Sequence, residues 1–469
     1  MSKPASALTG DDHHGSVGLR GNLTTSSIAL LIIAAAAPLG VVIGQTPVGF
    51  MLGNGPGLAG TFILAGLLIV CFAAGYSALI RDIPGAGAFY NYLSVVFGKK
   101  VGTGAALVAL AAYLMNCSAL AAGGGYFTDL VLQSFNIHIG WKLLSACYVV
   151  VVAILGRSNV DIAAKFVVPL VLAEFAIIIL LAVAIIYHKG MAAFPYQAVA
   201  PAFVFKKGFG FALMTGLSAF IGVESAALYV LEARDPSRAI PRATLGAVIL
   251  ISIAYLVSIW TIVGAVGANG IQALAAKEQG DLVLGVMQTN AGEAVAGIAA
   301  IMVCTSVFAC YLSLHNAATR YVFTLAQRRV MPGALAVVNP KHGSPSRASL
   351  VVTIFVALVA GVPALLNVDP YTVLFPSEMA LSTIGIIALQ AAVAIATIVH
   401  FRRKRDSRVW VSFVYPLIGA VGLLTATWLV ASNYPALTGS TSVLLNSAPI
   451  LLVVVFLYGW LVTRSDRGY

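Results

Sequence analysis

The stretch AAAAPLGVVIGQTPVGF, residues 34–50, decides how this chain is expected to fold. It lies in an apolar segment, residues 26–50, that is long enough to cross a membrane as one helix. Each unmade backbone hydrogen bond costs several kcal/mol in hydrocarbon, so a plain spanning helix has no reason to contain clustered helix breakers. This segment has two prolines and three glycines, which predict an interrupted membrane helix: Pro38, Gly40, Gly44, Pro47 and Gly49.

A second stretch of this kind, TGLSAFIGVESAALY at residues 215–229, follows five expected helices later. It contains Gly216, Gly222 and the acid Glu224. Interrupted helices at corresponding positions of two five-helix halves are typical of transporters built from inverted repeats, with the substrate site near the middle of the membrane. Freed amides and carbonyls at such breaks can bind the carboxylate and ammonium groups of a substrate. The alternative is that proline and glycine merely kink tightly packed helices.

The composition of the whole chain excludes an ordinary soluble protein. Of 469 residues, 60% are hydrophobic and only 9% are charged, against about 25% charged in a typical globular chain. The mean hydropathy is +0.97. The apolar runs are continuous over about 20 residues, where strands would alternate, so we expect an all-α integral membrane protein. Twelve transmembrane helices are expected, at residues 26–50, 57–80, 101–132, 141–156, 166–187, 210–231, 243–266, 292–321, 349–366, 372–400, 409–431 and 446–463.

The net charge of +11 indicates orientation rather than a nucleic-acid partner, because the basic residues form no dense stripe. With the amino terminus in the cytoplasm, 22 of the 27 Lys and Arg residues fall on the cytoplasmic side. That asymmetry follows the positive-inside rule. We therefore expect a multi-pass protein of the plasma membrane, the inner membrane of a bacterium, with both termini in the cytoplasm and the lipid bilayer as its partner.

The expected helices divide the chain into four parts. Residues 1–25 lack a long apolar run and are expected to form a disordered cytoplasmic tail. Residues 26–190 would form a first five-helix repeat, and residues 191–405 a second one. Residues 406–469 would form helices 11 and 12 with a short cytoplasmic tail.

Four stretches resemble the amino acid, polyamine and organocation permease superfamily. They are IPGAGAFYNYLSVVFG at residues 83–98, EARDPSRAIPRA at 232–243, HNAATRYVFTLAQRRVMP at 315–332 and AIATIVHFRRKR at 394–405. Ala88 and Phe89 depart from the family's usual second glycine and its spacing to the first aromatic residue. The resemblance covers roughly residues 25–465. It implies a leucine-transporter-like fold, a 5+5 inverted repeat plus two C-terminal helices, with helices 1 and 6 interrupted.

The resemblance also implies a substrate site at the two breaks. In the first break Gly40 keeps the family's second glycine, whereas Pro38 replaces the first one and has no amide hydrogen to donate. In the second break Phe220 would be the aromatic gate. On the third span, Tyr113 and Asn116 lie one turn apart and would line the pocket, or else make interhelical hydrogen bonds. The substrate-binding residues implied by these patterns are Pro38, Leu39, Gly40, Val41, Val42, Tyr113, Asn116, Phe220, Ile221, Gly222, Val223 and Glu224.

Two acids, Glu174 and Glu224, lie well inside expected spans. A charge there costs roughly 2.5 to 3.5 kcal/mol on insertion scales, which makes both acids functional candidates. Glu174 aligns with a lysine of proton-coupled relatives, and we expect it to couple proton movement to transport. A permanently protonated Glu174 bonded to a neighbouring helix is the alternative. Asp129, Glu293 and Glu378 are expected near span ends, at a solvated rim where a charge needs no special partner. Sodium coupling stays open, since Thr305, Ser306 and Ser313 carry oxygen ligands for a hard cation.

The sequence thus predicts a secondary active transporter for an amino acid or a related small amine, working by alternating access with proton symport. Exchange of an amino acid for an amine or polyamine, and sodium symport, are the alternatives. The sequence contains no H-E-x-x-H or G-x-S-x-G motif, so neither of these catalytic motifs favours an enzyme. We expect no cofactor and no metal site. Some relatives bond to a glycoprotein partner through a cysteine between spans three and four; residues 133–140 contain none, so no such partner is expected.

Overall fold

The computed structural model describes residues 24–83, 87–157, 160–229, 233–339, 344–438 and 442–463 of the chain. These residues form helices and short connections, with one isolated β-bridge between Asn339 and Ser344 in the described ranges. Most of the predicted disordered tail, residues 1–23, lies outside the described residues, as do residues 464–469.

The helices follow one another along the chain with short connections. The first half contains α1 (Thr25–Ala36), α2 (Thr46–Leu52), α3 (Leu58–Asp82), α4 (Ala88–Phe97), α5 (Lys99–Ser134), α6 (Trp141–Leu155), α7 (Val160–Lys189), α8 (Pro201–Val204) and α9 (Phe209–Ser218). The second half contains α10 (Pro236–Val266), α11 (Ile271–Glu278), α12 (Leu282–Ala291), α13 (Glu293–Gln327), α14 (Ser346–Leu365), α15 (Phe375–Arg403), α16 (Tyr415–Ser432), α17 (Tyr434–Thr438), α18 (Val443–Asn446) and α19 (Ala448–Val462).

Ten helical segments within the described ranges are long and apolar enough to cross a membrane. They match ten of the twelve expected spans. The other two expected spans, residues 141–156 and 446–463, correspond to α6 and α19, which are apolar but only 15 residues long each. A helix of that length measures about 22 Å, less than the roughly 30 Å of a hydrocarbon layer. The all-helical membrane architecture is therefore confirmed, whereas the count of twelve stays a prediction.

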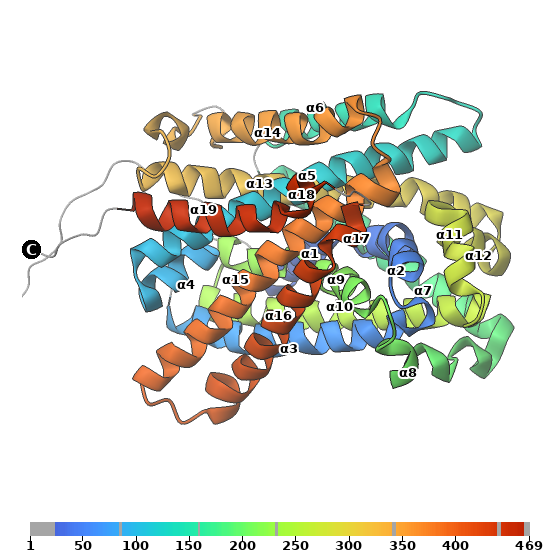
Figure 1. The fold of residues 1–469 in the computed structure, drawn as a ribbon, viewed down its shortest axis with the longest axis horizontal. Helices are drawn as coiled ribbons and strands as arrows, with labels where there is room; N and C mark the ends of the chain where they lie inside the picture. Colours follow the sequence, from blue (N-terminus) through green and yellow to red (C-terminus); the bar gives the residue numbers. More distant parts are fainter. Residues whose placement is uncertain are drawn as a thin grey trace, which may run out of the picture.

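The long helices run between two ends of the molecule. In Figure 1 the short helix α4 lies at the left end, and α11 and α12 lie at the right end. Helix α5 is the central element, because it packs against α4, α6, α13, α15 and α19. On the other side of the molecule, α3 packs against α10 and α16.

Glycines bring the neighbours of α5 close to its backbone. A Cβ atom on Gly104 would come within 2.8 Å of Phe456, and one on Gly459 would come within 2.8 Å of the Gly104 backbone, so α5 and α19 cross in near contact. A Cβ on Gly124 would lie 2.4 Å from the Tyr148 ring of α6. Small residues at such crossings are the usual means of tight helix packing in membranes.

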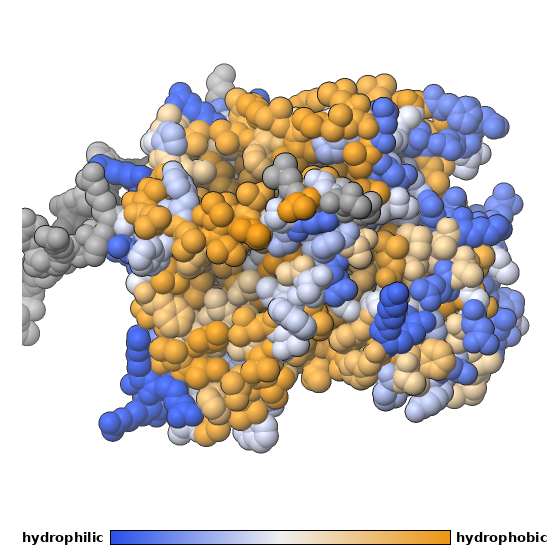
Figure 2. All heavy atoms as spheres, in the orientation of Figure 1, coloured by the Kyte–Doolittle hydropathy of each residue, from blue (hydrophilic) through white to orange (hydrophobic). Residues whose placement is uncertain are grey.

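The outer surface of the bundle is apolar. Large hydrophobic side chains are exposed along α7, α14, α16 and α19, among them Leu172, Ile179, Leu358, Trp428 and Leu457. Figure 2 shows apolar residues covering the middle of one face, with hydrophilic residues gathered toward the left and right ends. An apolar surface of this extent suits a lipid bilayer and would be a liability in water.

The first span is interrupted where the sequence predicts. Helix α1 ends at Ala36 because Ala37 adopts a left-handed conformation, with φ 45° and ψ 67°, and Pro38 follows it. A π-helical turn, Gly40–Gln45, then leads into α2. Its wider turns leave carbonyl groups that a regular helix would have used.

The sixth span is interrupted as well. Helix α9 ends at Ser218, and a 3-10 helix, Val223–Tyr229, continues in its place. Between them Gly222 has φ 105°, a conformation that only glycine adopts without strain. Gly222 therefore forms the bend of the second break.

Candidate functional site

The two interrupted spans touch each other at their breaks. A Cβ atom on Gly222 would lie 2.7 Å from the Cβ atom of Ala35, so only glycine fits there. Tyr255 of α10 adds a second link, since its hydroxyl donates to the Ala36 carbonyl at 3.1 Å and lies 3.4 Å from the Ala219 carbonyl. Tyr255 is fully buried. One phenol thus joins the end of α1 to the end of α9.

Glu174 lies against the first break. Its Oε2 atom accepts hydrogen bonds from the Leu39 amide at 3.1 Å and from the Ser306 hydroxyl at 2.8 Å. The Ser306 oxygen in turn accepts from the Gly40 amide at 3.2 Å. The two amides freed by the break are therefore satisfied by side chains from α7 and α13. Glu174 is 2% exposed, so its carboxyl group is held away from water.

Glu224 lies at the second break and is fully buried. The Gly222 amide donates to both carboxylate oxygens, at 3.1 and 3.2 Å. Tyr113 of α5 donates to Oε1 at 2.6 Å, and Gln390 of α15 donates to Oε2 at 3.2 Å. The Glu224 carboxyl group therefore caps the break and ties it to α5 and α15. The Glu224 carbonyl also accepts from the Tyr76 hydroxyl at 3.1 Å.

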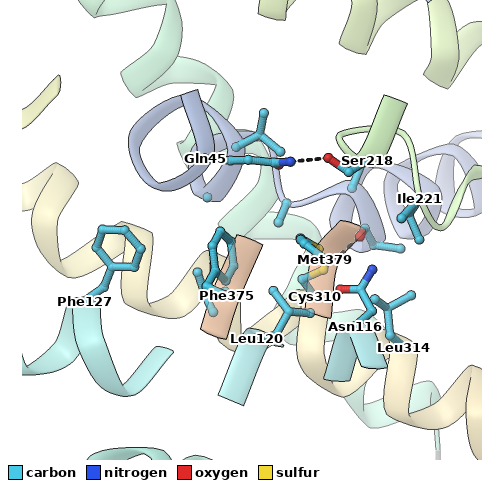
Figure 3. Close-up of a pocket in the computed structure, with 16 residues that line it drawn as sticks. Gln45, Asn116, Leu120, Phe127, Ser218, Ile221, Cys310, Leu314, Phe375 and Met379 are labelled. Atoms are coloured by element: carbon cyan, nitrogen blue, oxygen red, sulfur yellow. Dashed lines mark hydrogen bonds between the residues drawn. The ribbon is translucent and has the colours of Figure 1, made fainter. Parts of the chain in front are cut away.

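A cavity lies between the two breaks and three long helices (Figure 3). Its volume is about 30 Å³, enough for one or two water molecules and too small for an amino acid. The residues that line it come from the first span, α5, the second break, α13 and α15: Ala35, Ala36, Ala37, Gly40, Val41, Gln45, Asn116, Leu120, Phe127, Ser218, Ile221, Val307, Cys310, Leu314, Phe375 and Met379.

Most polar side chains of the cavity wall are bonded to protein groups. Gln45 donates to the Thr215 carbonyl at 3.3 Å and to the Ser218 hydroxyl, and Cys310 donates to the Ala35 carbonyl at 3.0 Å. Asn116 differs, because its Oδ1 atom is buried and has no hydrogen-bond partner among the described residues. Figure 3 shows Gln45 and Ser218 on one wall, and Asn116 on the opposite wall pointing into the cavity.

Aromatic side chains pack together beside the cavity, and one of them, Phe127, lines it. Tyr126 stacks on Tyr371 with ring centroids 4.7 Å apart, and Phe127 meets Tyr371 edge-on at 5.8 Å. The Tyr371 hydroxyl donates to the Gly44 carbonyl at 2.9 Å, and a Cβ on Gly44 would lie 3.0 Å from the Phe127 ring. The bonds from Tyr113 and Gln390 to Glu224 tie the second break to the bundle on another side.

Of the twelve predicted substrate-binding residues, the structure places four on the cavity wall: Gly40, Val41, Asn116 and Ile221. The other eight are packed around the wall: Pro38, Leu39, Val42, Tyr113, Phe220, Gly222, Val223 and Glu224. Phe220, the expected aromatic gate, is fully buried and packs edge-on against Tyr255 at 5.9 Å.

Sequence reasoning missed several wall residues. Gln45 and Ser218 lie inside the two quoted stretches and could have been found as polar residues beside a break. Cys310, Phe375 and Met379 carried no signal beyond their place in apolar spans. The expectation that Glu378 lies at a solvated rim was wrong. Its side chain is buried in α15, accepts from the Ser118 hydroxyl at 3.0 Å, and leaves Oε2 without a partner among the described residues.

The three possible cation ligands on α13 have different hydrogen-bond partners. Ser306 is bonded to Glu174, whereas Thr305 donates to Met302 at 2.9 Å and Ser313 to Ala309 at 2.8 Å within their own helix. Among the described residues no group of three or more His, Cys, Asp or Glu side chains could hold a metal ion. The site is thus a small, mostly apolar cavity between two interrupted helices. The buried carboxyl groups of Glu174 and Glu224 hold the residues behind its wall.

Known membrane transporters are similar to this chain over most of its length. The chain is 24% identical over 439 residues to the methylthioribose transporter of Bacillus subtilis, covering 90% of each chain. It is 24% identical over 437 residues to the branched-chain amino acid permease BcaP of B. subtilis, covering 89% of each. It is 26% identical over 430 residues to the aromatic amino acid transport protein AroP of Escherichia coli K12, covering 88% of this chain and 89% of that one.

A solved structure shares the fold. The manganese transporter of Eremococcus coleocola, crystallised with an aromatic bis-isothiourea compound, superposes with a TM-score of 0.56 at 13% identity, covering 94% of this chain and 96% of that one. The family model described as amino acid permease matches residues 23–456. With ten apolar helices of spanning length among its described residues, this chain is a multi-pass membrane protein that belongs to the amino acid permease family, within the amino acid, polyamine and organocation superfamily.

Proposed function

We propose that this permease is a secondary active transporter that moves an amino acid, or a related small amine, by alternating access. The observation that carries the proposal is the meeting of two interrupted spans at one cavity, which α5, α13 and α15 complete. Interrupted helices in corresponding halves of a chain form the mid-membrane sites of such transporters. The relatives named as a branched-chain permease and an aromatic amino acid transport protein support an amino acid as the solute.

Twelve spans in a 5+5 inverted repeat plus two C-terminal helices are part of the proposal. The two breaks lie in the first and sixth spans when α6 is counted as the fourth. Helix α6 packs against α5, α13 and α14, and α19 packs against α5, so both short helices belong to the bundle. A mismatch between short helices and a thicker hydrocarbon layer is accommodated by local thinning of the bilayer and by snorkelling of flanking residues.

The proposed orientation places both termini on the cytoplasmic side of the plasma membrane. The end of the molecule that carries α4 would then be cytoplasmic, and the end that carries α11 and α12 would face outward (Figure 1). The basic cluster Arg402, Arg403, Lys404 and Arg405 lies at the C-terminal end of α15, which is the cytoplasmic end in this orientation, as the positive-inside rule requires.

The small size of the cavity supports alternating access. Its present size excludes a substrate, so binding requires that one side open first. The outward gate would be the cluster of Tyr126, Phe127 and Tyr371, and the inward gate the bonds from Tyr113 and Gln390 to Glu224. Opening of one gate while the other stays closed carries a solute across without a continuous pore.

We propose proton symport, with Glu174 as the coupling residue. Its carboxyl group joins the Leu39 amide of the moving break to Ser306 of α13. Hydrogen bonds to an ionised carboxylate are about twice as strong as neutral ones, so a proton on Glu174 weakens both links. Protonation would then release the first break from α7 and α13, and loss of the proton would restore it.

The experiment uses the full chain, purified and reconstituted in liposomes with an imposed pH gradient. Wild-type protein should accumulate a labelled amino acid and take up protons with it. Glu174→Gln keeps the size of the side chain and should lose gradient-driven accumulation while counterflow between equal pools persists. Glu293→Gln, at the start of α13, is the matched control and should behave as wild type. Unchanged accumulation in Glu174→Gln would exclude proton coupling through this residue.

The same vesicles separate the alternatives. Uptake that requires amino acid or polyamine on the opposite side indicates exchange, and uptake that follows a sodium gradient at constant pH indicates sodium symport. The cavity wall and the similarity to the methylthioribose transporter also support a second candidate solute, an uncharged thioether sugar. Uptake of methylthioribose without uptake of any amino acid would favour that candidate.

A further inference from the structure

The cavity wall carries no formal charge. None of the sixteen residues that line the cavity is Asp, Glu, Lys, Arg or His. Alkyl, aromatic and thioether groups make up most of the wall and come from every element around the cavity: Val41, Leu120, Phe127, Ile221, Val307, Leu314, Phe375 and Met379. A ligand in this space is therefore surrounded by groups that favour an apolar side chain.

Three buried carboxyl groups around the cavity lie outside its wall, and Glu378 of α15, which accepts from Ser118, is the one with an open oxygen, Oε2, among the described residues. Glu174 is bonded to the Leu39 amide and to Ser306. Glu224 is bonded to the Gly222 amide, Tyr113 and Gln390, and neither acid lines the cavity. A ligand whose side chain carried a charge would lose its water and find no opposite charge in the wall, which is strongly unfavourable.

Asn116 offers the cavity its open hydrogen-bonding group. The residue is 1% exposed, and its Oδ1 atom has no partner in the described part of the chain. The other polar groups of the wall, on Gln45, Ser218 and Cys310, already donate to protein atoms. A buried acceptor without a donor is costly, so a ligand that brings an N–H group is favoured over one that does not.

Resting on the transport function proposed above, we propose that the cavity selects neutral amino acids with aliphatic, thioether or aromatic side chains. In this proposal Asn116 is a specificity-determining residue, whose carboxamide oxygen accepts a hydrogen bond from the ammonium group of the ligand. Charged amino acids are excluded by the apolar wall rather than by size, because the cavity must widen for any amino acid.

Competition for uptake tests the substrate class. The full chain in liposomes takes up labelled leucine in the presence of unlabelled leucine, methionine, phenylalanine, lysine, arginine or glutamate. The three neutral competitors should inhibit at concentrations about a hundredfold lower than the three charged ones, because an unpaired charge in the wall is heavily penalised. Equal inhibition by lysine or glutamate would overturn the substrate class and leave the transport function standing. Absence of uptake of every amino acid would overturn the proposed transport of amino acids itself.

Variants at position 116 test the role of the carboxamide. Asn116→Leu should weaken the competition by leucine about tenfold, the effect of one lost hydrogen bond to a charged donor. The variant should also reduce the preference for leucine over 4-methylpentanoate, which lacks the ammonium group. Asn290→Leu, on α12 and outside the cavity, is the matched control and should keep wild-type competition.

A second variant at position 116 is expected to improve the binding of a charged amino acid instead of weakening the binding of leucine. Asn116→Asp puts a carboxylate into the wall, so lysine should compete about tenfold better than in the wild type. A folded Asn116→Asp protein that discriminates against lysine as strongly as the wild type would overturn the assignment of position 116, as would an Asn116→Leu protein with unchanged competition by leucine.

Discussion

The hydroxyl group of Tyr255 donates a hydrogen bond to the Ala36 carbonyl at 3.1 Å, and the Ala219 carbonyl lies 3.4 Å from the same hydroxyl. Ala36 is the last residue of α1, and Ala219 follows the last residue of α9. A phenol of α10 therefore donates to the carbonyl group at the end of α1 and lies beside the carbonyl group that follows α9. The two interrupted spans are joined through a third helix as well as by direct contact.

The variant Tyr255→Phe removes this hydroxyl and keeps the ring. We expect a loss of about 1 kcal/mol in stability, the usual value of a buried hydrogen bond. Uptake should fall about tenfold, because the breaks no longer keep their relative position. Initial rates of uptake and the thermal unfolding midpoint measure the two effects.

Tyr148→Phe is the control for that variant. Tyr148 of α6 has a hydroxyl that donates to the Cys304 carbonyl at 3.0 Å and lies 3.0 Å from the Thr128 hydroxyl, so neither of its partners belongs to a break. Its loss should lower the unfolding midpoint to a similar extent and leave uptake near the wild-type rate. Equal loss of uptake in both variants would show that the effect of Tyr255 is one of general stability.

The variant Ser306→Ala removes the hydroxyl that donates to Glu174 and accepts from the Gly40 amide. The ionised carboxylate then has one donor fewer, so a proton binds more readily. We expect the midpoint of the pH dependence of uptake to move upward by about one unit. Ser313→Ala, on the same helix and bonded to Ala309, should leave the midpoint in place.

Asp406 supplies a second control for the pH dependence. It lies in the connection between α15 and α16, where hydrogen bonds from Arg408 lower its pKa to about 2. Asp406 is therefore ionised across the whole range in which transport is measured. Asp406→Asn should leave the pH profile of uptake unchanged, and a displaced profile in this variant would contradict the assignment of proton coupling to Glu174.

The variant Tyr113→Phe removes the 2.6 Å hydrogen bond to Glu224. Because this bond ties the second break to α5, we expect the gate to open more readily and counterflow of labelled amino acid to change at least severalfold. Tyr92→Phe removes a hydroxyl that has no partner within the described residues and should have little effect. Counterflow in proteoliposomes measures both variants under identical conditions.

The variant Gly222→Ala should be the most damaging of the single changes. The residue has φ 105°, and a Cβ atom there would lie 2.7 Å from that of Ala35. Left-handed backbone costs an alanine about 1 to 2 kcal/mol before the clash is counted. We expect a clear fall in the thermal unfolding midpoint. Gly246→Ala, in α10 with open space around it, should be neutral or slightly stabilising.

The sequence predicted the helical membrane architecture because hydrocarbon leaves a chain few choices. Continuous apolar runs must form helices, and breakers such as Pro38 and Gly222 must mark interruptions, since unpaired backbone groups are too costly in lipid. The same reasoning identified Glu174 as an acid that needs a partner. Its actual partners, the Leu39 amide and Ser306, come from segments far apart in the chain, and no local pattern could have named them.

The wall of the cavity was predicted less well. Which face of a helix looks inward depends on rotation about its axis, and every face of these helices is apolar, so composition does not show it. Gly40 and Asn116 face the cavity, whereas Tyr113, one turn from Asn116, turns toward Glu224. Glu378 was misplaced because hydropathy gives the depth of a residue in its span but not its neighbours: the first turn of α15 packs against α5, where Ser118 donates to this carboxyl group.

The first interruption is formed by an alanine and a proline rather than by a flexible glycine pair. Ala37 is held at φ 45°, and the ring of Pro38 fixes the next dihedral angle. Such a junction resists twisting, unlike one built of glycine, which rotates freely. Helix α1 and the turn at Ala37 and Pro38 would therefore move as one body, so that rotation within the first span is confined to the residues that follow Pro38.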